Sequence, residues 1–131
     1  MPRIAFIFLL LAVPVHGLAA DAVEEGYRTN LVPRLVRGAA PVEPLFALSN
    51  PALVVEAVKL AEDGSGDVVV RLYESLGRRS LGTITANFPV QGSCAVDLLE
   101  RLVQEPGVEC GGNVVDLKLR PFQLVTLRFA R

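Results

Sequence analysis

Few residues in this 131-residue chain carry side chains of the kind that do chemistry, and they are scattered along the sequence. His16 is the only histidine, whereas a metal site normally needs several His, Cys, Asp or Glu ligands that converge. Glu24 is adjacent to Glu25, and Glu62 is adjacent to Asp63. A catalytic carboxylate pair must face its substrate across roughly 5–9.5 Å, and sequence adjacency gives no sign of that arrangement. We therefore expect solvated carboxylates, and we assign no catalytic, cofactor-binding or metal-ligating residue.

The two cysteines, Cys94 and Cys110, have no CxxC spacing and leave two alternatives open. They can form one disulfide in a secreted protein, or they can remain ordinary buried thiols in the cytosol. The chain is large enough to build its own hydrophobic core, which favours the thiols.

The composition indicates a globular protein of one domain or less. Hydrophobic residues make up 51% of the chain, which excludes disorder. The net charge is −1 and the basic residues form no patch, whereas a dedicated nucleic-acid binder is clearly basic. No nucleophile elbow, zinc-protease motif or nucleotide-binding glycine loop is present in the sequence. The residues alone therefore predict a domain without a visible active site.

The first 22 residues support two interpretations. Arg3, the apolar run Ile4–Val13 and the small-x-small triplets that follow are typical of a secretory signal peptide. The β-branched and aromatic residues of the same run, which ends at Pro14, also suit a buried strand. The run is too short for a membrane-spanning helix, which needs roughly 20 apolar residues. A signal peptide would make the protein secreted, whereas a strand would leave it in the cytoplasm.

Prolines divide the chain into two parts. Four prolines and Gly38 fall within residues 32–51 and predict a linker or an extended crossing segment instead of a helix. We expect residues 1–44 to hold the N-terminal strand, or signal peptide, together with this Pro-rich linker. Residues 45–131 are then expected to form the folded domain.

Short apolar runs separated by turn signals predict an antiparallel sandwich or barrel. The turn cluster at residues 62–67 lies between two such runs and predicts a β-hairpin. Arg78–Arg79 is expected at another hairpin tip, and Pro106–Asn113 is expected to be a loop. Pro89–Ser93 should interrupt the sheet, and Ala95–Leu102 is either a short strand entering a turn or one helical turn. Strands are predicted at Leu53–Leu60, Val68–Glu74, Ser80–Phe88, Val114–Arg120 and Gln123–Phe129.

Alternation within these strands sets which side chains face the core. A slip of one residue would bury charge and expose leucine, so the faces are strongly specified. We expect one set of residues to point inward: Val70, Leu72, Leu117, Leu119 and Leu127. A second set should face solvent or a neighbouring domain: Arg71, Lys118 and Arg120.

Four segments, taken in order, carry a resemblance to a known family. Asn50–Gly64 reads NPALVVEAVKLAEDG, and Val70–Glu74 reads VRLYE with Gly77 after it. VDLLER follows at Val96–Arg101, and LRPFQ follows at Leu119–Gln123. Together these segments resemble the C-terminal β-sandwich of the family 38 α-mannosidases, particularly the cytosolic and bacterial type.

The resemblance extends upstream and bears on the N-terminus. Leu10–Gly17 reads LLAVPVHG and is similar to a family strand that ends in LLPHxG. Val23–Leu31 reads VEEGYRTNL and is similar to the VxxAYxLNxPL segment that follows that strand, with Tyr27 and Asn30 matching. This resemblance favours a strand over a signal peptide, and hence a cytoplasmic protein.

The resemblance implies an all-β, antiparallel β-sandwich, preceded by an N-terminal strand and an extended Pro-rich segment. It also implies a non-catalytic role beside a catalytic domain that hydrolyses terminal α-D-mannosides, with carbohydrate possible at a domain rim. Zinc and the aspartate nucleophile belong to that catalytic domain, so no cofactor, catalytic residue or zinc ligand carries over to this chain. Neither nucleic acid nor a membrane span is implied.

Two rival interpretations remain. One is a small secreted β-sandwich that binds carbohydrate or protein, with a cleaved signal peptide and a Cys94–Cys110 disulfide. The other is a nonfunctional truncation that cannot fold alone. The resemblance itself predicts a fragment or a truncated relative of a longer enzyme.

Overall fold

A computed structural model describes residues 22–31 and 43–131 of the chain. The predicted strand or signal peptide at residues 4–13 lies outside the described residues. Residues 22–31 contain a short helix, α1 (Ala22–Asn30), which the sequence patterns did not predict. An exposed ion pair between Arg28 and Glu25, at 2.8 Å, supports the helix.

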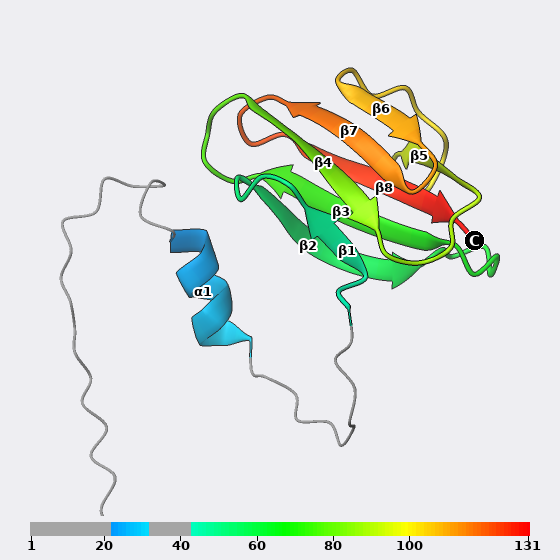
Figure 1. Cartoon of the computed structure of the whole chain (residues 1–131), viewed down its shortest axis with the longest axis horizontal. Coiled ribbons are helices and arrows are strands. Elements are labelled where there is room, and N and C mark those ends of the chain that lie inside the picture. The colour runs from blue at the N-terminus through cyan, green and yellow to red at the C-terminus, as the bar shows by residue number, and fades with distance from the viewer. Residues whose placement is uncertain (1–21, 32–42) are drawn as a thin grey trace, which may run out of the picture. The chain divides into compact units, whose positions relative to one another are not determined.

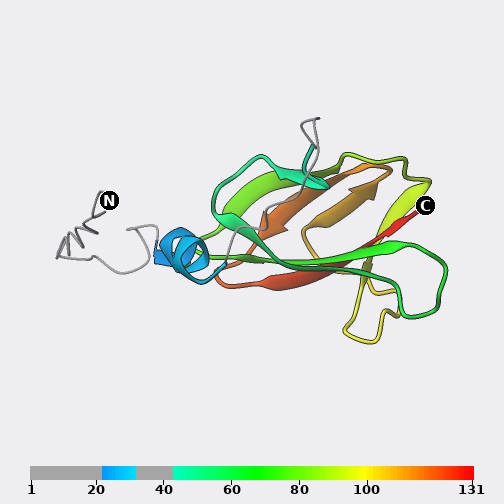
Figure 2. The same cartoon turned by 90° about the horizontal axis from the view of Figure 1, so that it is seen from below.

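The later segment folds into an antiparallel β-sandwich, which confirms the predicted fold class (Figure 1). One sheet has the strand order β1-β4-β7-β6 and the other has the order β2-β3-β8-β5. Figure 2 shows the two sheets as facing layers. The strands are β1 (Phe46–Leu48), β2 (Leu53–Leu60), β3 (Val68–Glu74), β4 (Ser80–Ala86), β5 (Gly92–Val96), β6 (Val108–Gly111), β7 (Val114–Leu119) and β8 (Leu124–Ala130).

The core lies between the sheets, as the alternation predicts. In the register of β3 and β8, Val70 is opposite Leu127 and Leu72 is opposite Val125, so their side chains share the inner face. The aromatic ring of Phe46 packs on Phe129 with the centroids 5.1 Å apart. The five side chains predicted to point inward are at most 3% exposed: Val70, Leu72, Leu117, Leu119 and Leu127.

The predicted outward set is also placed on outer faces. Lys118 and Arg120 are exposed. Arg71 lies on the outer face of its sheet but is half-buried, and its Nε is buried without a hydrogen-bond partner.

The predicted strands agree with β2, β3, β4, β7 and β8 to within two residues at each end. The hairpin predicted at residues 62–67 is confirmed, because β2 and β3 pair antiparallel on either side of it. Residues 32–51, predicted as a linker or an extended crossing segment, contain β1, whose three residues are too few to show a period between Pro44 and Pro51. One prediction was wrong because turn residues hid a short strand: the predicted loop Pro106–Asn113 contains β6, which pairs with β7.

Two connections also differ from the prediction. Arg78–Arg79 does not form a hairpin tip, because β3 and β4 belong to different sheets and the chain crosses between them there. Alternation within a strand cannot reveal which strand will be its partner, so the crossing was not visible in the sequence. The predicted break Pro89–Ser93 extends into β5, which begins at Gly92. Of the two alternatives for Ala95–Leu102 the strand is correct, since Val96 pairs with Leu102 across a tight turn.

Candidate functional site

The adjacent carboxylates singled out in the sequence bind different cations and do not form a pair. Glu62 Oε1 lies 2.7 Å from Lys59 Nζ, whereas Asp63 Oδ2 lies 2.6 Å from Arg128 Nη2. Glu25 is ion-paired with Arg28 on the helix surface. His16 and the side chain of Glu24 lie outside the described part of the chain.

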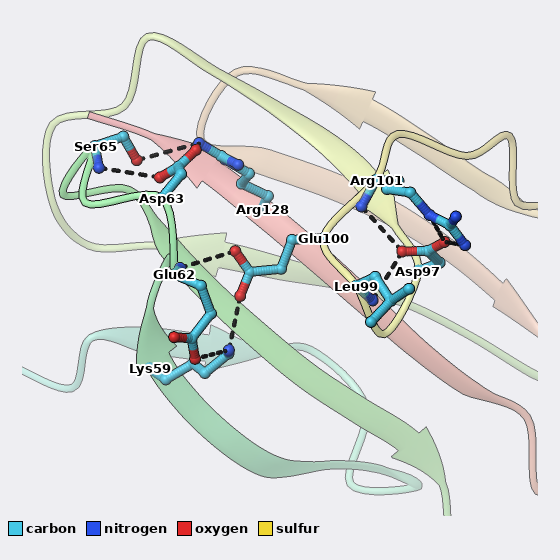
Figure 3. Close-up of polar contacts among 9 residues, drawn as sticks. All are labelled: Lys59, Glu62, Asp63, Ser65, Asp97, Leu99, Glu100, Arg101 and Arg128. Carbon is cyan, nitrogen blue, oxygen red and sulfur yellow. Dashed lines mark hydrogen bonds and ion pairs between the residues drawn. The ribbon is translucent and has the colours of Figure 1, made fainter.

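Arg128 of β8 organises the turn between β2 and β3 (Figure 3). Its guanidinium donates to Asp67 Oδ2 at 2.8 Å and contacts both Asp63 and the Ser65 hydroxyl. Hydrogen bonds from Ser65, and then the bond from Arg128, lower the pKa of Asp63 far below its usual range. The backbone N–H of Arg131, and then Arg128, lower the pKa of Asp67. These carboxylates are therefore anions fixed by hydrogen bonds, unsuited to proton transfer near neutral pH.

Glu100 fastens the loop after β5 to the opposite edge of the same sheet (Figure 3). Its side chain is 9% exposed, and Oε1 lies 2.7 Å from Lys59 Nζ. Its Oε2 accepts a hydrogen bond from the backbone N–H of Glu62 at 2.9 Å. Glu100 adopts a left-handed backbone conformation, with φ of 61°, which brings the carboxylate into this position. Because β5 and β2 are the two edge strands of their sheet, the loop must lie across its outer face.

Glu74 is the one fully buried acid among the described residues, with 0% exposure. Its carboxylate accepts hydrogen bonds from the backbone N–H groups of Leu76, Gly77 and Arg78 in the crossing after β3. The N–H of Phe122, from the turn before β8, donates to Oε2 at 3.1 Å. The Ser80 hydroxyl, at 3.1 Å from Oε1, completes the set.

These donors decide the charge state of Glu74. Burial raises the pKa of Glu74, but the backbone and hydroxyl donors outweigh burial and leave the pKa below its usual value. The ionised carboxylate therefore joins two turns that are far apart in the sequence. No substrate-facing role follows from this position, because the carboxylate is fully enclosed.

Both cysteines are free thiols in the structure. Cys94 is half-buried and Cys110 is exposed, so the expectation of buried thiols was wrong. They line one surface hollow between β5 and β6. Burial of each sulfur raises the pKa of each thiol, which keeps both protonated near neutral pH.

Within residues 22–31 and 43–131, no group of three or more His, Cys, Asp or Glu side chains could hold a metal ion. Over those same residues, no helix has the length and apolar character needed to span a membrane.

Among the described residues, hydrogen-bonded and ion-paired carboxylates fix the loops and turns of a β-sandwich domain. Comparison with known proteins agrees with this class. Residues 52–127 match the family model described as "Glycosyl hydrolases family 38 C-terminal beta sandwich domain". The chain belongs to this family.

Three relatives are α-mannosidases. Alpha-mannosidase 2C1 of Homo sapiens is 32% identical over 129 residues, covering 92% of this chain and 12% of the relative. Alpha-mannosidase 2C1 of Mus musculus is 30% identical, covering 92% of this chain and 10% of the relative. Alpha-mannosidase G of Dictyostelium discoideum is 27% identical, covering 85% and 11% respectively. The chain thus spans about a tenth of the length of these relatives.

Sequence reasoning missed the roles of two acids, although both stand in the segments that carry the family resemblance. Glu74 ends VRLYE and Glu100 lies within VDLLER. In each segment the acid stands at a position where the neighbouring pattern leads one to expect an apolar residue. A charged residue at such a position predicts an acid that is buried or that bridges two segments.

Proposed function

We propose that this chain is the non-catalytic C-terminal β-sandwich of an α-mannosidase-like glycoside hydrolase. The observation that carries the proposal is the family match over residues 52–127, together with relatives that are much longer enzymes. The parent reaction is the hydrolysis of terminal α-D-mannosides, and its zinc and nucleophile belong to a catalytic domain outside this chain. The domain packs on that catalytic domain, and carbohydrate binds where the two meet at a rim.

The proposed compartment is the cytoplasm. Two free thiols, one of them exposed, support a reducing compartment, where disulfides are rare. Mass spectrometry of protein expressed in a secretion-competent host tests this. Retention of residues 1–22, apart from Met1, is expected, whereas a mature N-terminus at Ala20, Asp21 or Val23 would contradict the proposal.

A chimeric enzyme tests the proposed function. The segment of human alpha-mannosidase 2C1 that this chain matches would be replaced by the whole 131-residue chain, with an unrelated β-sandwich of similar size as the control. We expect the chimera to hydrolyse a chromogenic α-mannoside and the control chimera to be inactive. The isolated chain should hydrolyse nothing, with or without added zinc. A chimera as inactive as its control would contradict the proposal.

A further inference from the structure

We propose that one outer face of the sandwich docks onto the longer polypeptide of the enzyme. This leucine face is defined by Leu98, Leu99, Leu102 and Leu124. The inference rests on the proposed function and adds to it the surface that makes the contact.

The four leucine side chains are open to solvent in this chain. Leu98, Leu99 and Leu102 are 68%, 72% and 76% exposed, and all lie on the loop after β5. Leu124 of β8 is 46% exposed, and it lines one surface hollow together with Leu98. Leu99 adjoins Leu98 along the loop, and Leu102 lines the neighbouring hollow that holds both cysteines. Single exposed leucines are ordinary, whereas a contiguous apolar patch on a soluble protein marks a contact site.

The opposite face of the sandwich has a different character. This face belongs to the sheet β1-β4-β7-β6. In its register, Thr83 of β4 is opposite Asp116 of β7, and Asp116 is opposite Glu109 of β6. Leu81, at 67% exposure, is opposite Lys118 and stands among these polar residues. The outer face of this sheet is therefore polar, whereas the outer face of the other sheet carries the four exposed leucines beside the ion pairs of Asp97 with Arg101 and of Lys59 with Glu100.

The loop that carries the leucines is fixed before any partner binds. Asp97 accepts hydrogen bonds from the backbone N–H groups of Leu99 and Arg101, both at 2.9 Å, and its own N–H donates to the Arg101 carbonyl. The guanidinium of Arg101 lies 2.7 Å from Asp97 Oδ2. Glu100 then fastens the loop to Lys59 and to the N–H of Glu62 (Figure 3). Such preorganisation lowers the entropy cost of binding, because the loop need not be ordered at that moment.

An unsatisfied donor lies on the same outer face. Arg71 shares a register row with Thr126 and Val96, two strands from the start of the leucine loop and roughly 10 Å away at ordinary strand spacing. Its Nε is buried and has no hydrogen-bond partner. Because this Nε is enclosed by the chain itself, it adds no contact point to the leucine face.

The length of the relatives compared with the length of this chain indicates what covers the leucine face. The chain covers 12%, 10% and 11% of its three relatives, so a domain of this family belongs to a polypeptide roughly ten times as long. That polypeptide supplies the apolar surface that covers the leucine face. Interfaces between domains of one chain are of the size that a few exposed leucines and their surroundings provide.

The chimera described above tests this surface directly. A triple variant would combine Leu98→Ser, Leu99→Ser and Leu102→Ser. The single variant Leu99→Ser would be compared with Leu81→Ser, which changes a leucine of similar exposure on the polar face. In the chimera we expect the triple variant to inactivate thermally at least about tenfold faster, as the loss of one buried leucine produces. In the isolated chain the same variants should leave the melting temperature unchanged, because these side chains are already in water. Glu100→Ala keeps the leucines but frees the loop, and it should produce a smaller acceleration in the chimera.

The outcomes separate the two proposals. An active chimera in which Leu99→Ser and Leu81→Ser have the same effect would overturn the docking surface and leave the proposed function standing. A lower melting temperature of the isolated Leu99→Ser chain would also overturn it, because the leucine would then be stabilising the sandwich itself. An unsubstituted chimera without activity would contradict the proposed function, and the docking inference would be withdrawn with it.

Discussion

At the scale of single residues, the buried carboxylate of Glu74 joins two distant segments of the chain. It accepts hydrogen bonds from four backbone N–H groups and one hydroxyl, drawn from two segments that the sequence separates widely. An ionised acid in the interior is stable only when donors replace the water it has lost. Glu74 therefore links the crossing between the sheets to the turn before β8.

Replacing this carboxylate should destabilise the whole sandwich. Glu74→Gln presents an amide N–H₂ to groups that are themselves donors, so we expect it to lower the free energy of unfolding by about 3 kcal/mol. Urea denaturation measures this change. Glu109→Gln is the matched control, since Glu109 is exposed on β6 and its substitution should change stability by less than about 0.5 kcal/mol. Equal effects of the two substitutions would remove the role assigned to Glu74.

The pH dependence of stability follows from the same carboxylate. The pKa of Glu74 is lower in the folded protein than in the unfolded chain, where it is about 4.3. Its contribution to stability is therefore fully present above that value and is lost as the pH falls through the folded pKa. The difference in unfolding free energy between the unsubstituted protein and Glu74→Gln should stay constant near neutral pH and shrink below about pH 4.3. Denaturation curves at a series of pH values give this difference, and a difference that grew on acidification would have the wrong sign.

At the scale of elements, alternation predicted the strands that are long enough to show it. The burial pattern of β7 alternates between exposed and buried residues through Asp116, Leu117, Lys118 and Leu119, which the sequence displays directly. β1 and β6 have three and four residues, so no period can be read from them. Pairing between strands depends on contacts distant in sequence, and for that reason the crossing at Arg78–Arg79 was taken for a hairpin.

The polar contacts were hidden for the same reason. Glu100 contacts residues that precede it by about forty positions, and nothing in the local sequence specifies that contact. The family resemblance located the segment, whereas the role of its acid required the fold.

Gly107 offers a test of how β6 is placed beside β7. Its φ is 85°, and a Cβ at this position would lie 2.4 Å from the backbone oxygen of Lys118. The Lys118 N–H also donates to the Gly107 carbonyl at 2.7 Å, so the two backbones are held close together. Gly107→Ala should therefore destabilise the sandwich by about 2 kcal/mol more than Gly64→Ala, since both substitutions strain φ but only the first adds a steric clash. Gly64, with φ of 73° and nothing within 4 Å, is the matched control in the same denaturation experiment. Equal losses would show that the clash is relieved without cost.

At the scale of the whole molecule, the described core is built entirely from residues after position 43. Buried side chains from both sheets form one cluster, and β1 supplies Phe46 and Leu48 to it. The first contacts of this segment are backbone ones: Asn87 donates to the carbonyls of Pro44 and Leu45, each at 2.9 Å. The described part of the core therefore begins at the entry to β1.

Two deletions locate that boundary. Removal of residues 1–42 keeps every contact just described, so the remaining chain should melt cooperatively within about 2 °C of the full chain. Removal of residues 1–48 also takes away β1, and the ring of Phe46 leaves Phe88 and Phe129, whose centroids lie 5.5 Å and 5.1 Å from its own. The loss of one buried phenylalanine costs about 3–5 kcal/mol, which for a domain of this size lowers the melting temperature by about 12 °C or more. Circular dichroism melting curves of the three chains make the comparison. If the shorter deletion lowered the melting temperature as much as the longer one, residues 1–42 would have to contribute to the same core, and the boundary at β1 would be wrong.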